Sequence, residues 1–443
     1  MKLAVLGGGG FRVPLVYRAV AADDLVDEFC LYDPSPERLQ VIESVLGQMR
    51  IREKPLVVSS TTSLDEALAG SDFIFSAIRV GGLEGRIADE RAALDLGLLG
   101  QETTGPGGIA YALRTIPVAM AIAERVTQLA PRAFVINFTN PAGMITEAMQ
   151  RLLGKRVIGI CDTPSGLGRR LAAISEVPER DVRLDYVGLN HLGWLRSARY
   201  GDRELITEVL ADPDRLSRLE EAQLFGTDWL HSLGMIPNEY LYYYYNTREA
   251  VATIRAGAQT RGEFLHDQQH RFYERAAAHP RAALTDWFAT KDEREATYMR
   301  EARLDVGEER IGPEGGGYEQ VALDVMRAIA LDERRTMILN VRNGPTLPSL
   351  PPDAVIEVPA RVDATGATPL AVTSPPLTEL GLMQQVKGVE QLTIASALDD
   401  SPELAAKALA LHPLVDSTDI AKELLRRYRR NTPQLFQGVR ATA

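Results

Sequence analysis

Residues 1–12 read MKLAVLGGGGFR: an apolar run, residues 3–6, is followed by four consecutive glycines. The run is short enough for a buried strand, and Pro14 stands where the first turn of a helix would begin. Glycine permits a tight turn and a close approach of the backbone to a pyrophosphate, and the free N–H groups of a helix N-terminus bind anions. We therefore predict a dinucleotide-binding loop formed by Gly7, Gly8, Gly9, Gly10, Phe11 and Arg12.

An acidic residue follows the next apolar run. Asp33 lies directly after residues 29–32 and 26 residues after Gly7. A carboxylate there binds both ribose hydroxyls and repels a 2′-phosphate, which favours NAD over NADP. Arg12 stands where the motif G-x-G-x-x-G would have its third glycine. A strand-to-helix turn that needs glycine only for its conformation is therefore the alternative interpretation.

Apolar runs and helical patterns alternate along the first part of the chain. Runs of strand length recur at residues 56–58, 73–78, 134–138 and 157–160, and helical patterns occupy residues 36–48, 110–128 and 143–153. This repetition predicts a parallel sheet covered on both faces, and right-handed crossovers make it doubly wound. The predicted fold class is α/β: a Rossmann-type doubly wound parallel sheet followed by an α+β, largely helical substrate domain.

The pattern changes after about residue 181. Two strands are expected at residues 182–188 and 193–200, helices at 215–224, 260–278, 318–331, 380–398 and 402–430, and extended segments at 346–352 and 358–369. We expect an NAD-binding Rossmann domain over residues 1–185, a catalytic, substrate and oligomerisation domain over 186–430, and a loose C-terminal tail over 431–443. No flexible linker marks the boundary, so the two parts should pack intimately.

Composition restricts the partners of the chain. Its 443 residues carry a formal net charge of −11, with 45% hydrophobic and 25% charged residues, as in an ordinary globular protein. An acidic chain without polybasic clusters predicts no binding to nucleic acid or to anionic membranes. Any anionic substrate must be held by a few placed arginines. Two cysteines, no signal-peptide pattern and no run of about 18 apolar residues predict a cytoplasmic protein without a membrane span.

Three groups of segments resemble one enzyme family. They are GQETTGPGG at residues 100–108, NFTNPAG at 137–143, and GICDTP at 159–164 together with GLNHLGW at 188–194. In these segments the chain is similar to glycoside hydrolase family 4, the NAD- and metal-dependent glycosidases, and among them most similar to the 6-phospho-β-glucosidases. The resemblance covers roughly residues 1–415, through IPNEYL at 236–241, EGGGY at 314–318 and NVRNG at 340–344.

The resemblance implies roles for single residues. Cys161 and His191 match the two protein ligands of a divalent metal, usually Mn²⁺. Tyr240 matches the tyrosine proposed as the base. Asp162 matches an aspartate proposed as the acid in α-acting members, whereas many β-acting members have asparagine there. The positions that match contacts to the substrate and its phosphate are Arg86, Asn140 and Arg261. The family also implies a homodimer or homotetramer and a phosphorylated disaccharide or aryl glycoside as substrate.

The implied reaction explains why these residue types suit the site. NAD-dependent oxidation at C3 of the sugar makes the C2 proton acidic, its removal lets the C1 group leave by elimination, and water addition and re-reduction complete hydrolysis. A metal stabilises the enolate as a Lewis acid and lowers nearby pKa values, which brings a tyrosine with an ordinary pKa near 10 into use as a base. Arginine binds a phosphate with two parallel hydrogen bonds. Cys161 and Asn140 each follow a predicted strand, at the sheet edge where dinucleotides bind.

Plainer interpretations exist for each residue. Taken alone, Cys161 is a small hydrophobic residue and His191 a part-buried structural one. A thiolate with an imidazole favours zinc by ligand softness, so manganese comes from the resemblance alone. Arg86 could pair with the carboxylates one helical turn later. Asp162 could orient a metal ligand, and Tyr240 begins a tyrosine-rich run whose members are mostly packing residues.

Other functions remain open at this stage. Within the family, a 6-phospho-α-glucosidase or an α-galactosidase is the nearest alternative. A malate- or lactate-type NAD dehydrogenase would share the sheet and the cofactor loop but would need a His–Asp pair and no metal. An NAD-sensing or sugar-phosphate-binding regulator would keep the loop, yet Cys161, His191 and Tyr240 together argue against it.

Overall fold

A single sheet runs through the computed structural model, which describes residues 1–51, 56–297 and 317–437. Its first half is parallel, with strands in the order β3-β2-β1-β4-β5-β6. These strands are β1 (Lys2–Leu6), β2 (Glu28–Tyr32), β3 (Val57–Thr61), β4 (Phe73–Ser76), β5 (Phe134–Asn137) and β6 (Val157–Gly159). This is the doubly wound order, which confirms the predicted fold class.

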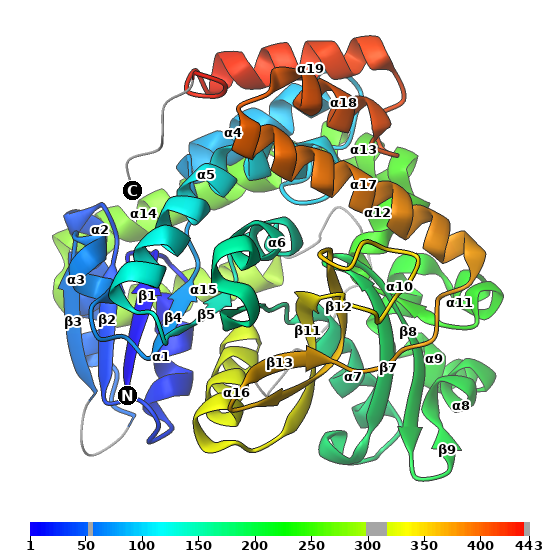
Figure 1. Ribbon diagram of the computed structural model, residues 1–443, viewed down its shortest axis with the longest axis horizontal. Helices are drawn as coiled ribbons and strands as arrows, with labels where there is room; N and C mark the ends of the chain where they lie inside the picture. The colour runs from blue at the N-terminus through cyan, green and yellow to red at the C-terminus, as the bar shows by residue number, and fades with distance from the viewer. Residues whose placement is uncertain (52–55, 298–316, 438–443) are drawn as a thin grey trace.

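Helices cover both faces of the parallel half (Figure 1). They are α1 (Val13–Ala21), α2 (Pro36–Gln48), α3 (Leu64–Leu68), α4 (Gly82–Leu94), α5 (Pro106–Leu129), α6 (Ala142–Leu153) and α7 (Thr163–Ile174). Strand β1 shows why both faces must be covered. Leu3 and Val5 belong to one hydrophobic cluster, and Ala4 and Leu6 to another. Successive side chains of a strand point to opposite faces, so a strand that is apolar throughout is buried on both.

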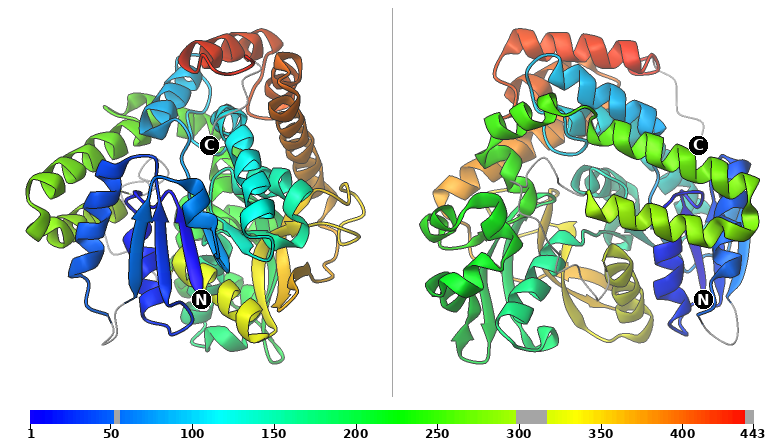
Figure 2. Two further views of the ribbon diagram at one scale, coloured as in Figure 1. Left: turned by 60° about the vertical axis from the view of Figure 1, so that its left-hand side comes forward. Right: turned by 180° about the vertical axis from the view of Figure 1, so that it is seen from behind.

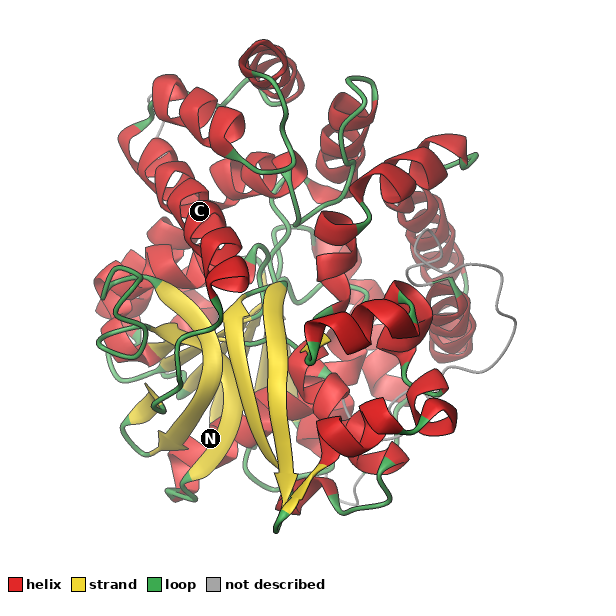
Figure 3. Ribbon diagram, turned by 90° about the vertical axis from the view of Figure 1, so that its right-hand side faces the viewer, coloured by secondary structure: helices red, strands yellow, loops and turns green. Residues whose placement is uncertain are grey.

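The sheet does not stop at β6. Its second half is antiparallel and continues through β11, β12, β7, β8 and β10, with β11 joined to β6 at Asn340 and Gly159. The strands are β7 (Arg183–Leu189), β8 (Leu192–Tyr200), β9 (Arg203–Glu204), β10 (Ile236–Pro237), β11 (Arg335–Arg342), β12 (Val355–Asp363) and β13 (Gly366–Pro369). Figure 3 shows them as a continuous twisted layer with helices above it. The strands predicted at 182–188 and 193–200 are present, whereas β11 was not predicted.

The remaining helices pack against both halves of the fold. They are α8 (Leu205–Ala211), α9 (Pro213–Ser217), α10 (Glu220–Phe225), α11 (Thr227–Leu233), α12 (Tyr242–Tyr245), α13 (Thr247–Ala256), α14 (Arg261–Ala278), α15 (Ala283–Ala296), α16 (Tyr318–Leu331), α17 (Leu377–Asp399), α18 (Pro402–Leu411) and α19 (Thr418–Asn431). The single helix predicted at 402–430 is wrong, because His412 leaves the helical region before Pro413, as residues preceding proline do. The helix predicted at 215–224 is also two helices, because Leu219 is extended between them.

Two predictions concern the ends and the interior of the chain. The tail expected at 431–443 lies in part outside the described residues, and Leu435 within it is buried in the cluster that joins α18 and α19. Helix α5 is long and apolar enough to cross a membrane, but 78% of its apolar window is buried inside the fold. It contacts α6 and α17, so α5 is a core helix and gives no support for a membrane span.

Candidate active site

A large cavity of about 2630 Å³ opens at the carboxyl ends of the parallel strands and reaches the helices of the second half. Ligands of doubly wound folds bind at this edge. The cavity brings together twelve of the residues singled out from the sequence: Gly7, Gly10, Phe11, Arg12, Asp33, Arg86, Asn140, Cys161, Asp162, His191, Tyr240 and Arg261. Gly8 and Gly9 do not line the cavity, but they form the same turn, whose backbone does.

The glycine turn is pressed tightly against the sheet. Gly7 has φ +85°, and a Cβ there would lie 2.7 Å from the carbonyl oxygen of Ala77. A Cβ on Gly8 would lie 2.8 Å from Cα of Leu31. The turn leads into α1, where the N-cap residue Arg12 forms no side-chain cap among the described residues. In this first turn Val13 N donates to Gly10 O, Pro14 has no N–H, and Leu15 N donates to Arg12 O, so Phe11 and Arg12, which line the cavity, are the positions at which an anion would approach the helix N-terminus.

Asp33 touches the turn from the end of β2. Its Oδ2 accepts a hydrogen bond from Gly9 N at 3.1 Å, and its Oδ1 accepts one from Ser35 N at 3.0 Å. A carboxylate has about four acceptor positions, so these two bonds leave capacity for ribose hydroxyls. Arg38, which the sequence did not single out, lies beside it: its Nε donates to the Gly9 carbonyl at 3.3 Å, and its guanidinium stacks 4.3 Å from the ring centroid of Tyr273.

Three aromatic side chains from the second half hold the carbonyl groups of the same turn. The Tyr273 hydroxyl donates to Gly9 O at 2.6 Å, Trp287 Nε1 donates to Phe11 O at 2.9 Å, and the Tyr318 hydroxyl donates to Arg12 O at 3.1 Å. The donors come from α14, α15 and α16. Figure 2 shows α14 and α15 lying against the N-terminal part of the fold. No local signal identifies these donors, because 264 or more residues separate them from the turn.

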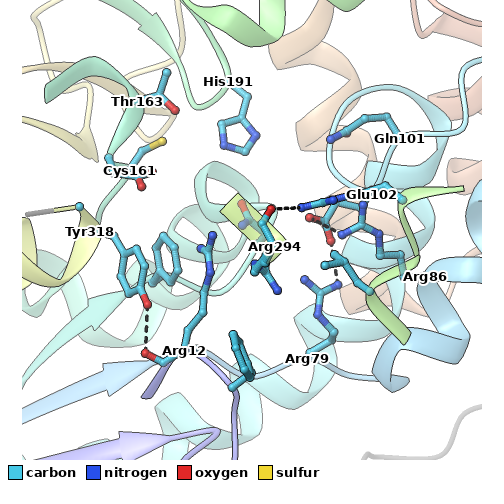
Figure 4. Close-up of a pocket in the computed structure, with 18 of the residues that line it drawn as sticks. Arg12, Arg79, Arg86, Gln101, Glu102, Cys161, Thr163, His191, Arg294 and Tyr318 are labelled. Atoms are coloured by element: carbon cyan, nitrogen blue, oxygen red, sulfur yellow. Dashed lines mark hydrogen bonds and ion pairs between the residues drawn. The ribbon is translucent and has the colours of Figure 1, made fainter. Parts of the chain in front are cut away.

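Cys161 and His191 lie on the same side of the cavity. Cys161 follows β6, and His191 occupies the tight turn between β7 and β8 with φ +63°. The His191 ring stacks on Tyr240 at 3.7 Å between centroids and 1° between planes, and its Nδ1 lies 3.0 Å from the hydroxyl of Thr103. Figure 4 shows the Cys161 sulfur pointing toward the imidazole. Asp162 lies next to Cys161 at the start of α7.

The protonation of this pair suits a divalent cation. Burial lowers the pKa of His191 to about 4, so the imidazole is neutral and its lone pair available at neutral pH. Burial, then the charges of Glu357 and Asp162, raise the pKa of the Cys161 thiol. A cation bound at the sulfur would favour the thiolate. Among the described residues no group of three or more His, Cys, Asp or Glu could hold a metal, so a pair would leave coordination positions open.

Arg86 takes part in a buried ion-pair cluster. Its Nε bonds Glu90 one helical turn later at 2.6 Å, and its Nη1 bonds Glu102 at 2.9 Å. Arg79 bonds the other oxygen of Glu102 at 2.8 Å. Burial alone would raise the pKa of Glu102, but Arg79 and Arg86 overcome it and lower that pKa. The helical ion pair expected as the plainer interpretation is therefore present, and Arg86 lines the cavity as well.

Arg294 adds a cation that the sequence did not reveal. Burial, then the charges of Arg12, Arg261 and Arg86, lower the pKa of its guanidinium, and Glu102 opposes them. Arg261 is oriented by the chain around it, since its Nη2 donates to the Arg294 carbonyl at 3.1 Å. Figure 4 shows Arg12, Arg79, Arg86 and Arg294 around one space. Such a concentration of guanidinium groups has the charge and the hydrogen-bond donors that suit an anion such as a phosphate.

The fold and this cavity define a Rossmann-type α/β protein in which the glycine turn, the Cys161–His191 pair and an arginine cluster line one cavity. The chain belongs to glycosyl hydrolase family 4. The model described as "Family 4 glycosyl hydrolase" matches residues 2–177, and the model of the "Family 4 glycosyl hydrolase C-terminal domain" matches residues 186–415. The family predicted from the motifs is confirmed.

Relatives from both anomeric classes match nearly the whole chain. A probable 6-phospho-beta-glucosidase of Bacillus subtilis is 30% identical over 461 residues, covering 100% of this chain and 99% of the relative. The 6-phospho-alpha-glucosidase 1 of Lacticaseibacillus paracasei is 30% identical over 450 residues, covering 96% and 95%. The structure of the Thermotoga maritima 6-phospho-beta glucosidase with manganese, NAD⁺ and glucose-6-phosphate has a TM-score of 0.81 at 28% identity, covering 98% and 99%.

Proposed function

We propose that this protein hydrolyses 6-phospho-β-glucosides with the help of NAD and Mn²⁺. The observation that carries the proposal is the single cavity in which the glycine turn, the Cys161–His191 pair and the arginine cluster meet. A hydride acceptor, a Lewis acid and a phosphate are the three groups that redox-assisted elimination brings together. The Thermotoga maritima relative, whose structure contains manganese, NAD⁺ and glucose-6-phosphate, supports this assignment.

The turn from Gly7 to Arg12 and Asp33 would hold the dinucleotide, and Cys161 and His191 would hold the metal. When bound, the metal supplies Lewis-acid stabilisation of negative charge on the sugar oxygens, and the dinucleotide supplies hydride transfer at C3. Cys161 and His191 fit a divalent metal because the imidazole is neutral and because the thiol would lose its proton when a cation binds.

The chain's own side chains bind the sugar and move its protons. Arg86, Arg261 and Arg294 bind the 6-phosphate, and Glu102 holds Arg86 in place. Tyr240, stacked on His191, accepts the C2 proton after C3 has been oxidised. Elimination of the C1 group, addition of water and reduction of C3 then complete hydrolysis without net redox change. Asn140, which lines the cavity after β5, contacts the sugar hydroxyls.

A 6-phospho-α-glucosidase is the second candidate, because Asp162 lines the cavity beside Cys161. In this position a carboxylic acid would donate a proton to the leaving oxygen of an α-glycoside. The curated relative of the α class, at 30% identity, supports keeping this candidate. Elimination next to a ketone depends less on the geometry of the leaving group than direct displacement does, so one site could accept both anomers.

The proposal extends to the substrate class, the oligomeric state, the cellular location and the roles of the two parts of the chain. The substrate would be a phosphorylated disaccharide or aryl glycoside, and the protein a homodimer or homotetramer. We place the enzyme in the cytoplasm, which two buried free cysteines and a phosphorylated substrate favour. Residues 1–185 would bind the cofactor, and residues 186–430 the substrate.

The test is an assay with the α- and β-anomers of p-nitrophenyl 6-phosphoglucoside, each with NAD⁺, Mn²⁺ and a reductant. We expect nitrophenol release that depends on both additions, is faster for the β-anomer, and leaves no accumulated NADH. The unphosphorylated glycosides serve as controls and should react far more slowly. NADH formed in step with substrate loss would indicate a dehydrogenase instead, and NAD binding without turnover would indicate a regulator.

A further inference from the structure

A carboxylate that belongs to no motif is buried in the middle of the sheet, beside the Cys161–His191 pair. Glu357 of β12 is 0% exposed. Its cross-strand partners are Asn340 on β11 and Gly188 on β7, and Asn340 in turn faces Gly159 on β6. This row of residues crosses the sheet just below the segments that carry the pair, because Cys161 follows Gly159 by two residues and His191 follows Gly188 by three.

Glycines make room for polar side chains in this row. A Cβ on Gly159 would lie 2.8 Å from the Cβ of Asn340, and a Cβ on Gly193 would collide with the Tyr186 hydroxyl. Both sites are tighter than any real Cβ contact, so a larger residue would displace these side chains. The fold thus keeps space for a polar cluster where an apolar layer would otherwise be expected.

The carboxylate of Glu357 accepts three hydrogen bonds. Asn340 Nδ2 and Asn190 Nδ2 donate to Oε1 at 2.8 and 3.4 Å, and the Tyr186 hydroxyl donates to Oε2 at 3.1 Å. Asn190 directly precedes His191 in the turn between β7 and β8. Glu357 therefore holds the turn that presents the imidazole.

A second path leads from Glu357 to Tyr240. Asn238 Nδ2 donates to the Tyr186 hydroxyl at 3.1 Å, and Asn238 Oδ1 accepts from Tyr240 N at 3.0 Å. Because Tyr240 stacks on His191, the contacts form a closed ring that begins and ends at the imidazole. Moving Glu357 would change the positions of both rings together.

The charge of Glu357 has no cationic partner in the described part of the chain. Its hydrogen-bond donors are all neutral, and no Lys, Arg or His there lies within ion-pair distance. Burial raises its pKa to about 7, and its charge raises the pKa of the Cys161 thiol. Glu147, another buried glutamate, is by contrast paired with Lys387 at 2.9 Å. A buried anion without a cation is unfavourable, and a divalent cation at Cys161 and His191 would supply one.

We propose that Glu357 is a positioning residue that balances the charge of the metal and aligns His191 with Tyr240. This rests on the proposed metal site. Glu357 acts through its neighbours and touches neither substrate nor metal. Groups that orient metal ligands in this way commonly change metal affinity or activity by about 10- to 100-fold when they are removed.

The test compares the Mn²⁺ affinity of the full-length protein and its variants, measured by the electron paramagnetic resonance signal of free Mn²⁺. Glu357→Gln keeps the shape and one acceptor oxygen but removes the charge. We expect about 10- to 100-fold weaker Mn²⁺ binding, with NAD⁺ affinity and melting temperature nearly unchanged. Glu147→Gln is the matched control: it removes a buried carboxylate from an ion pair, so it should lower the melting temperature and leave Mn²⁺ affinity unchanged.

The outcomes distinguish the proposed metal site at Cys161 and His191 from the proposed role of Glu357. Cys161→Ser should lose Mn²⁺ binding; if it binds as the wild type does, the metal site itself is wrong. If Cys161→Ser loses binding but Glu357→Gln retains wild-type affinity, the role of Glu357 is overturned alone. A Glu357→Gln variant that melts early but binds Mn²⁺ normally would make Glu357 a purely structural residue and also overturn the proposal.

A second variant keeps the proposal testable if Glu357→Gln does not fold. Tyr186→Phe cuts the path from Glu357 to Asn238 without removing charge. We expect kcat to fall about tenfold with KM and Mn²⁺ affinity little changed, because the alignment of Tyr240 is lost while the metal ligands stay in place. An unchanged kcat would contradict the positioning of Tyr240 by this ring.

Discussion

Arg294 shares its side of the cavity with three other guanidinium groups, whose charges act on it together with its burial. Like charges at close range raise the free energy of the ligand-free site. A bound phosphate would relieve this repulsion and receive charge-assisted hydrogen bonds at the same time. We therefore assign Arg294 the same task as Arg86 and Arg261, although it belongs to no recognised motif.

Replacing Arg294 tests this task. Arg294→Gln should raise KM for a p-nitrophenyl 6-phosphoglucoside by about 10- to 100-fold, because a hydrogen bond to a charged group contributes about 1.5–3 kcal/mol. Inhibition by inorganic phosphate should weaken in parallel. Arg180→Gln, whose side chain is 87% exposed, is the control and should behave as the wild type. An unchanged KM in Arg294→Gln would place the phosphate elsewhere.

His412 makes the stability of the fold depend on pH. Burial lowers its pKa from 6.5 to about 3, and its Nδ1 accepts a hydrogen bond from Leu414 N at 3.0 Å. Between those two pKa values the unfolded chain binds a proton that the folded chain does not, so stability falls as pH falls. The contribution is complete above pH 6.5 and is lost progressively toward pH 3.

Asn in place of His412 keeps an acceptor for Leu414 N without a titrating group. From pH 7.5 to pH 4.5, the unfolding free energy of the wild type should fall by about 2–3 kcal/mol more than that of His412→Asn. Urea unfolding at both pH values measures this difference. Parallel pH profiles for the two proteins would show that His412 is protonated in the folded state.

At the scale of elements, α14 and α15 connect the proposed phosphate site to the glycine turn. Arg261 begins α14 and Arg294 lies near the end of α15, whereas Tyr273 and Trp287 of the same two helices donate to the carbonyl groups of Gly9 and Phe11. Helices are stiff, so the turn and the arginines keep a constant spacing. The hydrogen bonds from Tyr273 and Trp287 fix the carbonyl groups of the turn, and so its position relative to the arginines.

The indole of Trp287 is the most buried of these donors. Removing it should therefore alter the conformation of the glycine turn. Trp287→Phe leaves the Phe11 carbonyl without its donor, which costs about 1–3 kcal/mol, and it leaves a cavity beside the turn. We expect a lower melting temperature and a several-fold weaker NAD⁺ affinity by calorimetry. Phe288→Leu, on the exposed side of the same helix, should change neither quantity. Wild-type NAD⁺ affinity in Trp287→Phe would rule out a role in shaping the turn.

For the whole molecule, the continuous sheet decides how the chain folds. Strand β6 pairs with β11, which lies some 180 residues later, and one hydrophobic cluster contains both Leu3 of β1 and Ile356 of β12. A chain cut at residue 185 would expose the edge of β6 and the apolar surface that this cluster buries.

We therefore expect residues 1–185 alone to be unfolded or aggregated and unable to bind NAD⁺, in spite of their complete parallel strands. Circular dichroism, limited proteolysis and calorimetry on the fragment check this. The intact protein should unfold in one transition, seen at the same temperature by circular dichroism and by tryptophan fluorescence. A fragment that is folded and binds NAD⁺ would show that the two halves are independent domains.

Local pattern was enough to predict the parallel half of the fold and the outline of the site. Apolar runs of strand length, helical periodicity and the glycines at residues 7–10 depend on neighbours in sequence, so strand β1, helix α2 and the turn between β1 and α1 could be recognised without the structure. The motifs GICDTP and GLNHLGW are contiguous in the sequence, so Cys161 and His191 could be singled out without the structure. Both residues line the cavity.

Tertiary structure alone decided which distant residues complete that site. Arg294, Trp287 and Glu357 have no sequence signature, because their roles depend on cross-sheet register and on helix packing over separations of about 170 to 280 residues. In the sequence, a glutamate that becomes buried cannot be distinguished from an exposed one until the position of its strand in the sheet is known. Position within the sheet determines burial and partners, and local composition carries information about neither.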